Sequence, residues 1–437
     1  MIAFATLFLG LVFGVNDVTL IAGPEAARAV LLLDGAEIAE LRGKPWTATV
    51  DLGPELAPHE LVAVAFDKDG REAGTVRQWI NRPRPPAEAS VVIERRGDTR
   101  VARLSWQSIV SAAPKFASVT VDGEPVPFAD AHEVTLPDVD RDRLHVLHAE
   151  LDFDGGVSVV QDVAFGGARS DEAAARLTAF PLLLEKKVKM PPPARLAGWF
   201  TLGGSSLTVA GVEEGPAEIV VVPHETARPA LEEIAHDVLG PPVAAVPFGF
   251  RREVLRSFAS LKKDQRVHVV WPQPHHREHS GFRYDLFPRS EELTSRDGGM
   301  LWFLTNVRYA LRSEIPVRLA DAVAVAGLHA AARDRRRAVV LVLGPEPPPA
   351  DSGRLAPQMT RRYLERLGVP LFVWCAGRER DPEWGACRDV SSAGKLDAAT
   401  KELTTALERQ RIVWLEGTFL PHAVGFTGDA GVTRLAR

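Results

Sequence analysis

The first residues with possible chemistry form a turn directly after the apolar run IVVV, which ends at Val222. The turn contains His224, Glu225 and Thr226, and an amphipathic helical pattern follows it. In α/β proteins, the turn after such a strand lies at the carboxyl edge of the sheet, where ligands gather. The elements around this turn therefore decide whether it is a working site.

A second group consists of the histidines His275, His276 and His279. On a helix, His275 and His279 would share one face, and such a pair binds zinc when a third ligand converges. The flanking Pro274 and Gly281 disfavour a helix, and no Glu stands in the position that H-E-x-x-H requires. An exposed polar loop is the favoured interpretation, and a zinc-dependent hydrolase is the alternative.

The sequence contains no complete nucleophile or phosphate-binding motif. The segment GGSSL at 203–207 lacks the second glycine of G-x-S-x-G, and SSAGKL at 391–396 departs from the P-loop pattern at both ends. The formal net charge of −5, with no long basic run, gives no reason to expect a nucleic-acid partner. The length of 437 residues, 46% of them hydrophobic, predicts about two to four globular domains.

The N-terminal residues 1–14 are apolar over the length of a signal-peptide core and too short to span a bilayer. Val12 and Gly14 suit the positions before a cleavage site, but no Lys or Arg follows Met1. Export with cleavage is the favoured prediction, and an internal strand is the alternative. The only two cysteines, Cys375 and Cys387, are either a disulfide that closes a short loop or two separate thiols.

Residues 15–167 show alternating apolar residues between Asp-Gly pairs, which is the pattern of hairpins. The segment AVLLLDGAEI with HELVAVAFDKDGREAGTVRQWIN parallels ASVTVDGEPV with LHVLHAELDFDGGVSVVQDVAF. This internal repeat predicts two β-sandwich modules, at 15–84 and 85–167, joined near the segment RPRPP. Each module resembles a bacterial immunoglobulin-like domain. Residues 168–217 are predicted to be a linker with short strands.

From residue 218 to the end, the period changes to apolar runs separated by helical patterns. Continuous runs of this kind suit strands that are buried on both faces, and their alternation with helices predicts a doubly wound, Rossmann-like parallel sheet. The expected strands share this apolar character and lie at 219–222, 266–271, 338–343, 369–374 and 411–415.

The region 218–437 resembles a von Willebrand factor type A domain of the kind found in secreted bacterial proteins after immunoglobulin-like modules. The segment IVVVPHETA matches the first strand and its metal loop, and GVPLFVWCAG matches the fifth strand. The helix and fourth strand are matched by IPVRLADAVAVAGLHAAARDRRRAVVLVLGPE. The resemblance implies a divalent metal site built from side-chain oxygens at the carboxyl edge of the sheet.

The positions that would supply those oxygens do not match the family pattern. Pro223 stands where the first Asp would be, and Ala227 stands in place of a Ser. Val317 replaces the Thr, and Gly344 replaces the Asp after the fourth strand. Only Glu225 keeps a carboxylate, and a single carboxylate does not hold Mg²⁺ against water. We therefore expect a degenerate metal site and no cofactor.

The implied function is non-catalytic protein–protein interaction, as in adhesion or assembly at the cell envelope, with no nucleic-acid partner. Trp271, Trp374 and Trp414 close three of the expected strands at the same edge, where they either pack beneath the loops or form an apolar floor for a partner. The candidate binding residues are Glu225, Trp271, Trp374 and Arg318, with the loops 272–288 and 345–357. The sequence leaves the partner and the oligomeric state open.

Overall fold

The computed structural model describes most of the chain, with short gaps. The described residues are 2–6, 8, 10–82, 87–96, 99–108, 113–121, 124–130, 132–139, 144–153, 158–166, 177–213, 216–240, 248–279, 282–308, 315–332, 335–348 and 353–435. They divide into two compact units. The larger unit contains 1–83, 179–415 and 419–437, and the smaller contains 84–178 with 416–418.

The N-terminal module of the larger unit is a β-sandwich made of one three-stranded and one four-stranded sheet. Buried apolar residues of both sheets, including Val18, Leu31 and Leu61, form its core. The strands, in the order in which they neighbour one another, are β1 (Ile2–Phe4), β2 (Val15–Ala22) and β5 (Thr47–Asp51), and then β4 (Ala36–Leu41), β3 (Arg28–Leu33), β6 (His59–Phe66) and β7 (Glu72–Ile80).

The smaller unit is a second β-sandwich with the same division into three and four strands. Its core includes Leu104, Val119 and Leu147. The neighbouring strands are β11 (Glu124–Pro125), β10 (Phe116–Val121), β13 (Leu144–Asp152) and β14 (Ser158–Gly166), facing β12 (Glu133–Thr135), β9 (Thr99–Ser108) and β8 (Ala87–Arg96).

The repeat seen in the sequence corresponds to a repeat in strand order. In each module the repeated segments form the four-stranded sheet, β4-β3-β6-β7 in the first and β11-β10-β13-β14 in the second. The turn between β3 and β4 has positive φ at Asp34 (52°) and Gly35 (82°), as a tight two-residue hairpin turn requires. The corresponding Asp-Gly pairs at 122–123 and 154–155 lie outside the described residues.

The α/β part of the larger unit is built on a six-stranded mixed sheet. All neighbouring strands pair in parallel except β23, which is antiparallel at one edge. In spatial order the strands are β23 (Leu293–Thr294), β20 (Gln265–Val269), β19 (Ala217–Pro223), β24 (Arg336–Leu343), β25 (Leu371–Cys375) and β28 (Arg388–Asp389).

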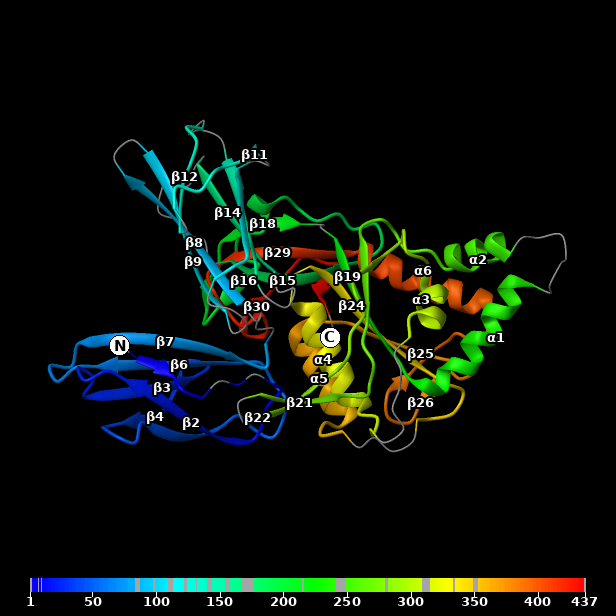
Figure 1. Ribbon diagram of the computed structural model, residues 1–437, viewed down its shortest axis with the longest axis horizontal. Helices are drawn as coiled ribbons and strands as arrows, with labels where there is room; N and C mark the ends of the chain where they lie inside the picture. Colours follow the sequence, from blue (N-terminus) through cyan, green and yellow to red (C-terminus); the bar gives the residue numbers. More distant parts are fainter. Residues whose placement is uncertain are drawn as a thin grey trace. The chain divides into compact units, whose positions relative to one another are not determined.

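Helices cover both faces of this sheet, as the near-continuous burial of β19 and β24 requires. Alternate residues of each strand enter two separate apolar cores. One core includes α4 (Leu319–Ala331) and α5 (Pro357–Leu367); the other includes α1 (Arg228–Leu239), α2 (Phe248–Ser257), α3 (Met300–Asn306) and α6 (Ala393–Glu408). Figure 1 shows α4 and α5 on one side of the strands and α1, α3 and α6 on the other.

One predicted strand of the parallel sheet belongs elsewhere. The segment 411–415 is part of β29 (Gln410–Glu416), which pairs with β18 (Val209–Glu213) and lies beside β15 (Leu177–Leu184). The side chain of Gln410 contacts the start of β24, where it bonds the backbone N–H and C=O of Arg337. The parallel-sheet prediction for 411–415 is therefore wrong, because this segment lies in a different sheet, where it pairs with β18 in antiparallel orientation.

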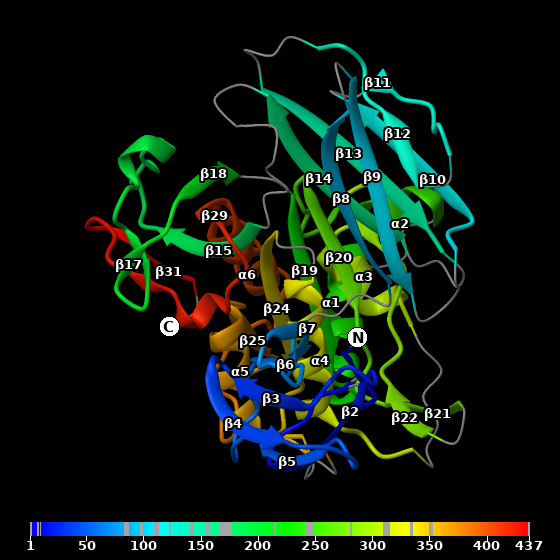
Figure 2. The same cartoon turned by 90° about the vertical axis from the view of Figure 1, so that its left-hand side faces the viewer.

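These strands form a further small β region within the larger unit. Phe180, Phe200 and Val413 contribute to its core. Residues 177–213 are thus folded structure rather than only a connecting segment. Figure 2 shows β15, β18, β29 and β31 (Val432–Arg434) side by side, although they come from distant parts of the sequence. A second sheet of this β region contains β16 (Phe200–Leu202), β17 (Ser205–Ser206) and β30 (Gly425–Phe426).

The first β module contacts α5 within the larger unit. Leu56 is fully buried in the same core as Tyr363. The Tyr363 hydroxyl donates a hydrogen bond to the backbone carbonyl of Asn81 at 2.7 Å. Burial raises the pKa of the Tyr363 phenol, which keeps it a neutral donor. Arg366 also pairs with Glu55 at 2.8 Å, so an apolar contact and polar contacts together join this module to α5.

The N-terminal segment forms local structure with the first module. Ile2–Phe4 pair with β2, and Phe8 and Val12 pack against the module core. This matches the internal-strand alternative in local structure, and cleavage of residues 1–14 stays a prediction. Among the described residues, no helix is both long and apolar enough to cross a membrane.

Candidate functional site

The carboxyl edge of the six-stranded sheet has the topology of a ligand site. From β19 the chain passes to α1 on one face, and from β24 it passes to α5 on the opposite face. In doubly wound sheets, ligands bind at the point where neighbouring connections leave to opposite faces. That point lies between Pro223 and Leu343, directly beside the turn with His224 and Glu225.

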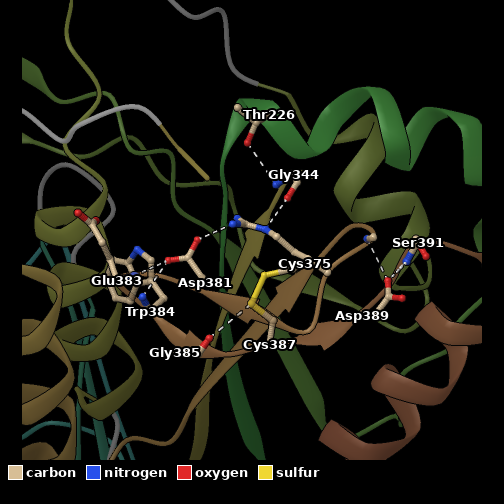
Figure 3. The surroundings of a disulfide bond; sticks show 12 residues. Thr226, Gly344, Cys375, Asp381, Glu383, Trp384, Gly385, Cys387, Asp389 and Ser391 are labelled. Carbon is tan, nitrogen blue, oxygen red and sulfur yellow. Dashed lines mark hydrogen bonds and ion pairs between the residues drawn. A yellow bond between two sulfur atoms is a disulfide. The ribbon is translucent and has the colours of Figure 1, made fainter. Parts of the chain in front are cut away.

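The turn after β19 is held closed by its own hydrogen bonds. His224 is buried, and its Nδ1 accepts a hydrogen bond from the backbone N–H of Thr226 at 3.3 Å. The Thr226 hydroxyl lies 2.8 Å from the same nitrogen and accepts a bond from the Gly344 N–H at 3.2 Å. Figure 3 shows Thr226 and Gly344 facing each other across the edge of the sheet. The turn is therefore bonded across the edge of the sheet to the residue that follows β24.

Gly344 permits this close contact because it has no side chain. A Cβ at this position would lie 2.2 Å from the backbone oxygen of Thr226. We expect Gly344→Ala to lower the free energy of unfolding by about 1–3 kcal/mol, because the turn must shift to make room. Urea unfolding measures the change. The matched control is Gly394→Ala, where a Cβ meets open space; equal stability of the two variants would contradict the close contact.

A buried ion pair supports Gly344 from the other side. Arg378 Nε donates to the carbonyl of Gly344 at 3.1 Å, and its guanidinium pairs with Asp381 at 2.9 Å. Asp381 is only 1% exposed and also accepts the backbone N–H groups of Glu383 and Trp384, both at 2.9 Å. This carboxylate therefore fixes both the arginine and the backbone of the following turn (Figure 3).

The segment that contains this ion pair is closed by a disulfide between Cys375 and Cys387. Of the two alternatives for the cysteines, the structure has the disulfide, and it describes no free cysteine. We call residues 375–387 the disulfide loop. It includes the short hairpin of β26 (Arg380–Asp381) and β27 (Gly385–Ala386), while Arg361 of α5 donates to the Trp384 carbonyl at 3.1 Å.

Beside the disulfide loop, a cavity of about 530 Å³ is lined by Glu379, Cys387, Arg388, Asp389, Gly394, Lys395 and Ala398. Asp389 accepts bonds from the Gly377 N–H at 3.0 Å, the Ser391 N–H at 2.9 Å and Lys395 Nζ at 2.5 Å. Burial raises the pKa of Asp389, but these donors outweigh it and hold the pKa well below its usual range. The carboxylate at the end of β28 is thus already paired with donors of the chain itself.

The candidate binding residues of the sequence analysis are not gathered on one surface. Glu225 is exposed on the turn after β19. Trp374 is only 1% exposed, because its ring packs in the core that contains α1 and α6. Trp271 is also buried. The prediction that these two tryptophans contact a partner is therefore wrong, and the packing alternative for their rings is correct.

Arg318 is committed to the start of α4. Its Nε donates to Asp321 Oδ2 at 2.7 Å, and both side chains of this ion pair are largely buried. Asp321 also accepts the backbone N–H groups of Arg354 and Leu355. Arg318 thus positions a carboxylate that holds a neighbouring loop, and its role as a partner-binding residue stays a prediction. Within the predicted loop 345–357, residues 349–352 lie outside the described part.

The three histidines lie on a strand rather than a helix. His275, His276 and His279 belong to β21 (His275–His279), which pairs with β22 (Phe282–Leu286). On a strand, residues four positions apart are about 13 Å apart along the chain, and adjacent residues point to opposite faces. On this strand His275 and His279 do not form the helical i, i+4 pair, and the hydrolase alternative stays a prediction. The side chains of His276 and His279 lie outside the described residues.

The sequence analysis missed Arg378 and Asp381, which stabilise the closed edge. Their spacing of three residues inside a cysteine-bounded segment was the available signal. It was not sufficient, because a charged pair in a loop is usually solvated and only the fold shows that this one is buried.

Comparisons with known proteins give only weak likenesses. No protein-family model matches the chain, and no curated protein matches it. Fibronectin(III)-like modules of Clostridium thermocellum CbhA are similar at 22% identity, over 18% of this chain and 93% of that chain, with a TM-score of 0.17. The central fibronectin-III array of RIM-binding protein is similar at 11% identity, over 48% of this chain and 79% of that chain, with a TM-score of 0.24.

A third similar structure is SGBP-B from the Bacteroides ovatus mixed-linkage glucan utilization locus, solved with a mixed-linkage heptasaccharide. It matches at 9% identity, over 43% of this chain and 84% of that chain, with a TM-score of 0.15. These TM-scores are too low to support a fold assignment, so the fold is described from the geometry of the chain itself. That geometry defines a multidomain, mostly β protein in which two β-sandwich modules accompany a helix-flanked mixed sheet.

Proposed function

We propose that this chain is a non-catalytic protein-binding protein, and that its helix-flanked sheet is a von Willebrand factor type A-like domain without a working metal loop. The segments that carry the resemblance lie on β19, on α4 with β24, and on β25. In the sheet, β20 and β23 lie on one side of β19, while β24, β25 and β28 lie on the other. This doubly wound order supports the proposal without being specific to one family.

The observation that carries the proposal is the closure of the edge between β19 and β24 by the chain's own atoms. Thr226 bonds Gly344 from one side and Arg378 bonds it from the other. A catalytic site needs space for a reacting group next to its chemistry. Pro223 and Ala227 offer no side-chain oxygen, so the turn lacks the oxygen ligands that Mg²⁺ requires.

The binding surface in this proposal is the exposed side of the disulfide loop together with Glu225. Glu379, Arg380 and Glu383 are exposed there, so the surface presents charges of both signs. The loop is held by the disulfide and by the Asp381 ion pair, so little conformational entropy is lost when it binds a partner. A protein surface with complementary mixed charges is the partner that this chemistry fits.

An exported location fits the same proposal. Disulfides persist in oxidising compartments and are rare in the cytosol. The Cys375–Cys387 bond therefore supports a secreted, periplasmic or cell-envelope protein.

The test is affinity capture by the full chain from the organism that encodes it, compared with two charge-reversal variants. Glu383→Arg changes the disulfide loop, whereas Glu37→Arg changes an exposed position on β4 as the matched control. We expect wild type and Glu37→Arg to recover the same protein and Glu383→Arg to recover at least about tenfold less, since rim charges set complementarity. Recovery should not require added Mg²⁺ or Mn²⁺. Equal recovery by both variants, or recovery only with these ions, would contradict the proposal.

A further inference from the structure

A buried polar cluster lies under α4, away from the carboxyl edge. Glu218 is the second residue of β19, at the opposite end of that strand from Pro223. Val220 is the register partner of His268 on β20, so Glu218 and His268 point to the same face of the sheet. This face is covered by α4, whose last turn contains His329.

The three side chains converge. Their ligand atoms all lie within 4.8 Å of one another. His268 Nε2 is 3.2 Å from Glu218 Oε1, and the two imidazole rings have centroids 5.0 Å apart. A tetrahedral zinc ion with bonds of 2.0–2.2 Å separates its ligands by about 3.4 Å, so small side-chain rotations suffice to enclose one.

Two of these groups are not satisfied by the described residues. Glu218 is 1% exposed and His268 is 3% exposed. Neither oxygen of Glu218 nor Nε2 of His268 has a hydrogen-bond partner in the described structure, because their mutual contact is not aligned as a hydrogen bond. A buried carboxylate in this state is costly unless a cation or a donor neutralises it.

The orientation of His268 is fixed from its other side. Its Nδ1 lies 3.3 Å from the carbonyl of Ser290, which can only accept. Ser290 is itself held beside β20 by two bonds with Val269, at 2.8 and 2.9 Å. With Nδ1 facing the Ser290 carbonyl, Nε2 is the ring nitrogen of His268 on the side of Glu218. A cation bound by both groups would satisfy the Glu218 oxygens and His268 Nε2, which have no hydrogen-bond partner among the described residues.

We infer that Glu218, His268 and His329 supply three ligands of a tetrahedral zinc site, with water as the fourth, that ties the last turn of α4 to β19 and β20. Two imidazoles and one carboxylate are a ligand set that zinc prefers and Mg²⁺ does not. Arg289 Nη1 lies 2.7 Å from Nε2 and 3.0 Å from Nδ1 of His329. Arg289 is exposed, so its guanidinium can turn toward solvent when a metal ion enters past the partly exposed His329.

The test uses the full chain without a histidine tag, freed of metal and titrated with Zn²⁺ by calorimetry and with Co²⁺ by visible absorption. We expect one ion per chain, tetrahedral Co²⁺ bands and a higher unfolding temperature with Zn²⁺. Glu218→Gln and His329→Ala should weaken Zn²⁺ binding by more than about tenfold and abolish the temperature shift.

Two controls keep the outcome decisive. His236→Ala removes an exposed histidine on α1, and the combined change of His275, His276 and His279 to Ala removes the β21 histidines. Both should bind Zn²⁺ as wild type does. His329 is partly exposed, so its variant is expected to fold, and circular dichroism checks this. Absence of stoichiometric binding would show that these three side chains do not hold zinc, and equal binding by the Glu218→Gln and His329→Ala variants would place the ion elsewhere. Either result would overturn the inference.

Discussion

Replacing Asp381 by alanine is expected to lower the free energy of unfolding by about 3–5 kcal/mol. The substitution leaves Arg378, whose side chain is 13% exposed, without its carboxylate partner. It also removes the acceptor for the backbone N–H groups of Glu383 and Trp384. A charge stranded in a buried position costs more than the intact pair contributes, which makes this one of the two largest effects that we expect.

Urea unfolding of Asp381→Ala and of Glu379→Ala measures this effect. Glu379 is exposed in the same loop, so its loss should change stability by no more than about 0.5 kcal/mol. The double variant Arg378→Met with Asp381→Leu removes both charges and should recover part of the lost stability. If Asp381→Ala were as stable as Glu379→Ala, the ion pair would be solvated, and the closed edge would lose its support.

The second large effect is expected at the contact between the first β module and α5. Tyr363→Ala should lower the free energy of unfolding by about 3–5 kcal/mol, because it leaves a cavity among buried residues that include Leu56. It also removes the donor to the Asn81 carbonyl. Asn81 is buried, and its side-chain amide donates to the carbonyls of Val12 and Ala57. Losing the hydrogen bond from Tyr363 therefore also weakens the packing at the end of the first module.

Tyr363→Phe is the matched control for the ring. It keeps the apolar contact and removes one hydrogen bond, so a loss of about 1 kcal/mol is expected. Denaturant unfolding monitored by far-UV circular dichroism compares the two variants. A loss near 1 kcal/mol for both would mean that the first module does not pack on α5, whereas separate unfolding transitions in wild type would show two independent parts.

The β modules were predictable because their signals are local. Asp34-Gly35 tolerates positive φ at both positions, and alternating apolar residues fix which face of β3 and β6 is buried. The repeated segments then led to the same strand order in both modules. The strands β19, β20, β24 and β25 were also predictable, because continuous apolar runs fit strands that are buried on both faces.

The position of 411–415 was not predictable from its own residues. An apolar run of this length fits a buried strand in either sheet, and its neighbours decide between them. Here β18 supplies antiparallel backbone partners from about 200 residues earlier in the chain, as the pairing of Val212 with Val413 shows. Pairing over such a separation leaves no local pattern in the sequence.

At the candidate site, the sequence indicated which chemistry was missing but not what replaced it. Pro223, Ala227 and Gly344 could be identified as positions without a ligand oxygen. The replacement is a set of contacts, from Thr226 and Arg378 to the two sides of Gly344. Such contacts depend on side-chain packing, which also explains why the sequence leaves two interpretations open for Trp374, a ring beneath the loops or part of a partner-binding surface, whereas the ring is buried.

The most direct test of the closed, metal-independent edge is a Mn²⁺ titration followed by electron paramagnetic resonance. The chains to compare are wild type, Glu225→Ala and Glu218→Gln, because Glu225 is the carboxylate exposed on the turn after β19 and Glu218 lies in the buried cluster under α4. We expect no tight Mn²⁺ binding that depends on Glu225. Tight binding that is lost in Glu225→Ala and retained in Glu218→Gln would contradict the closed edge.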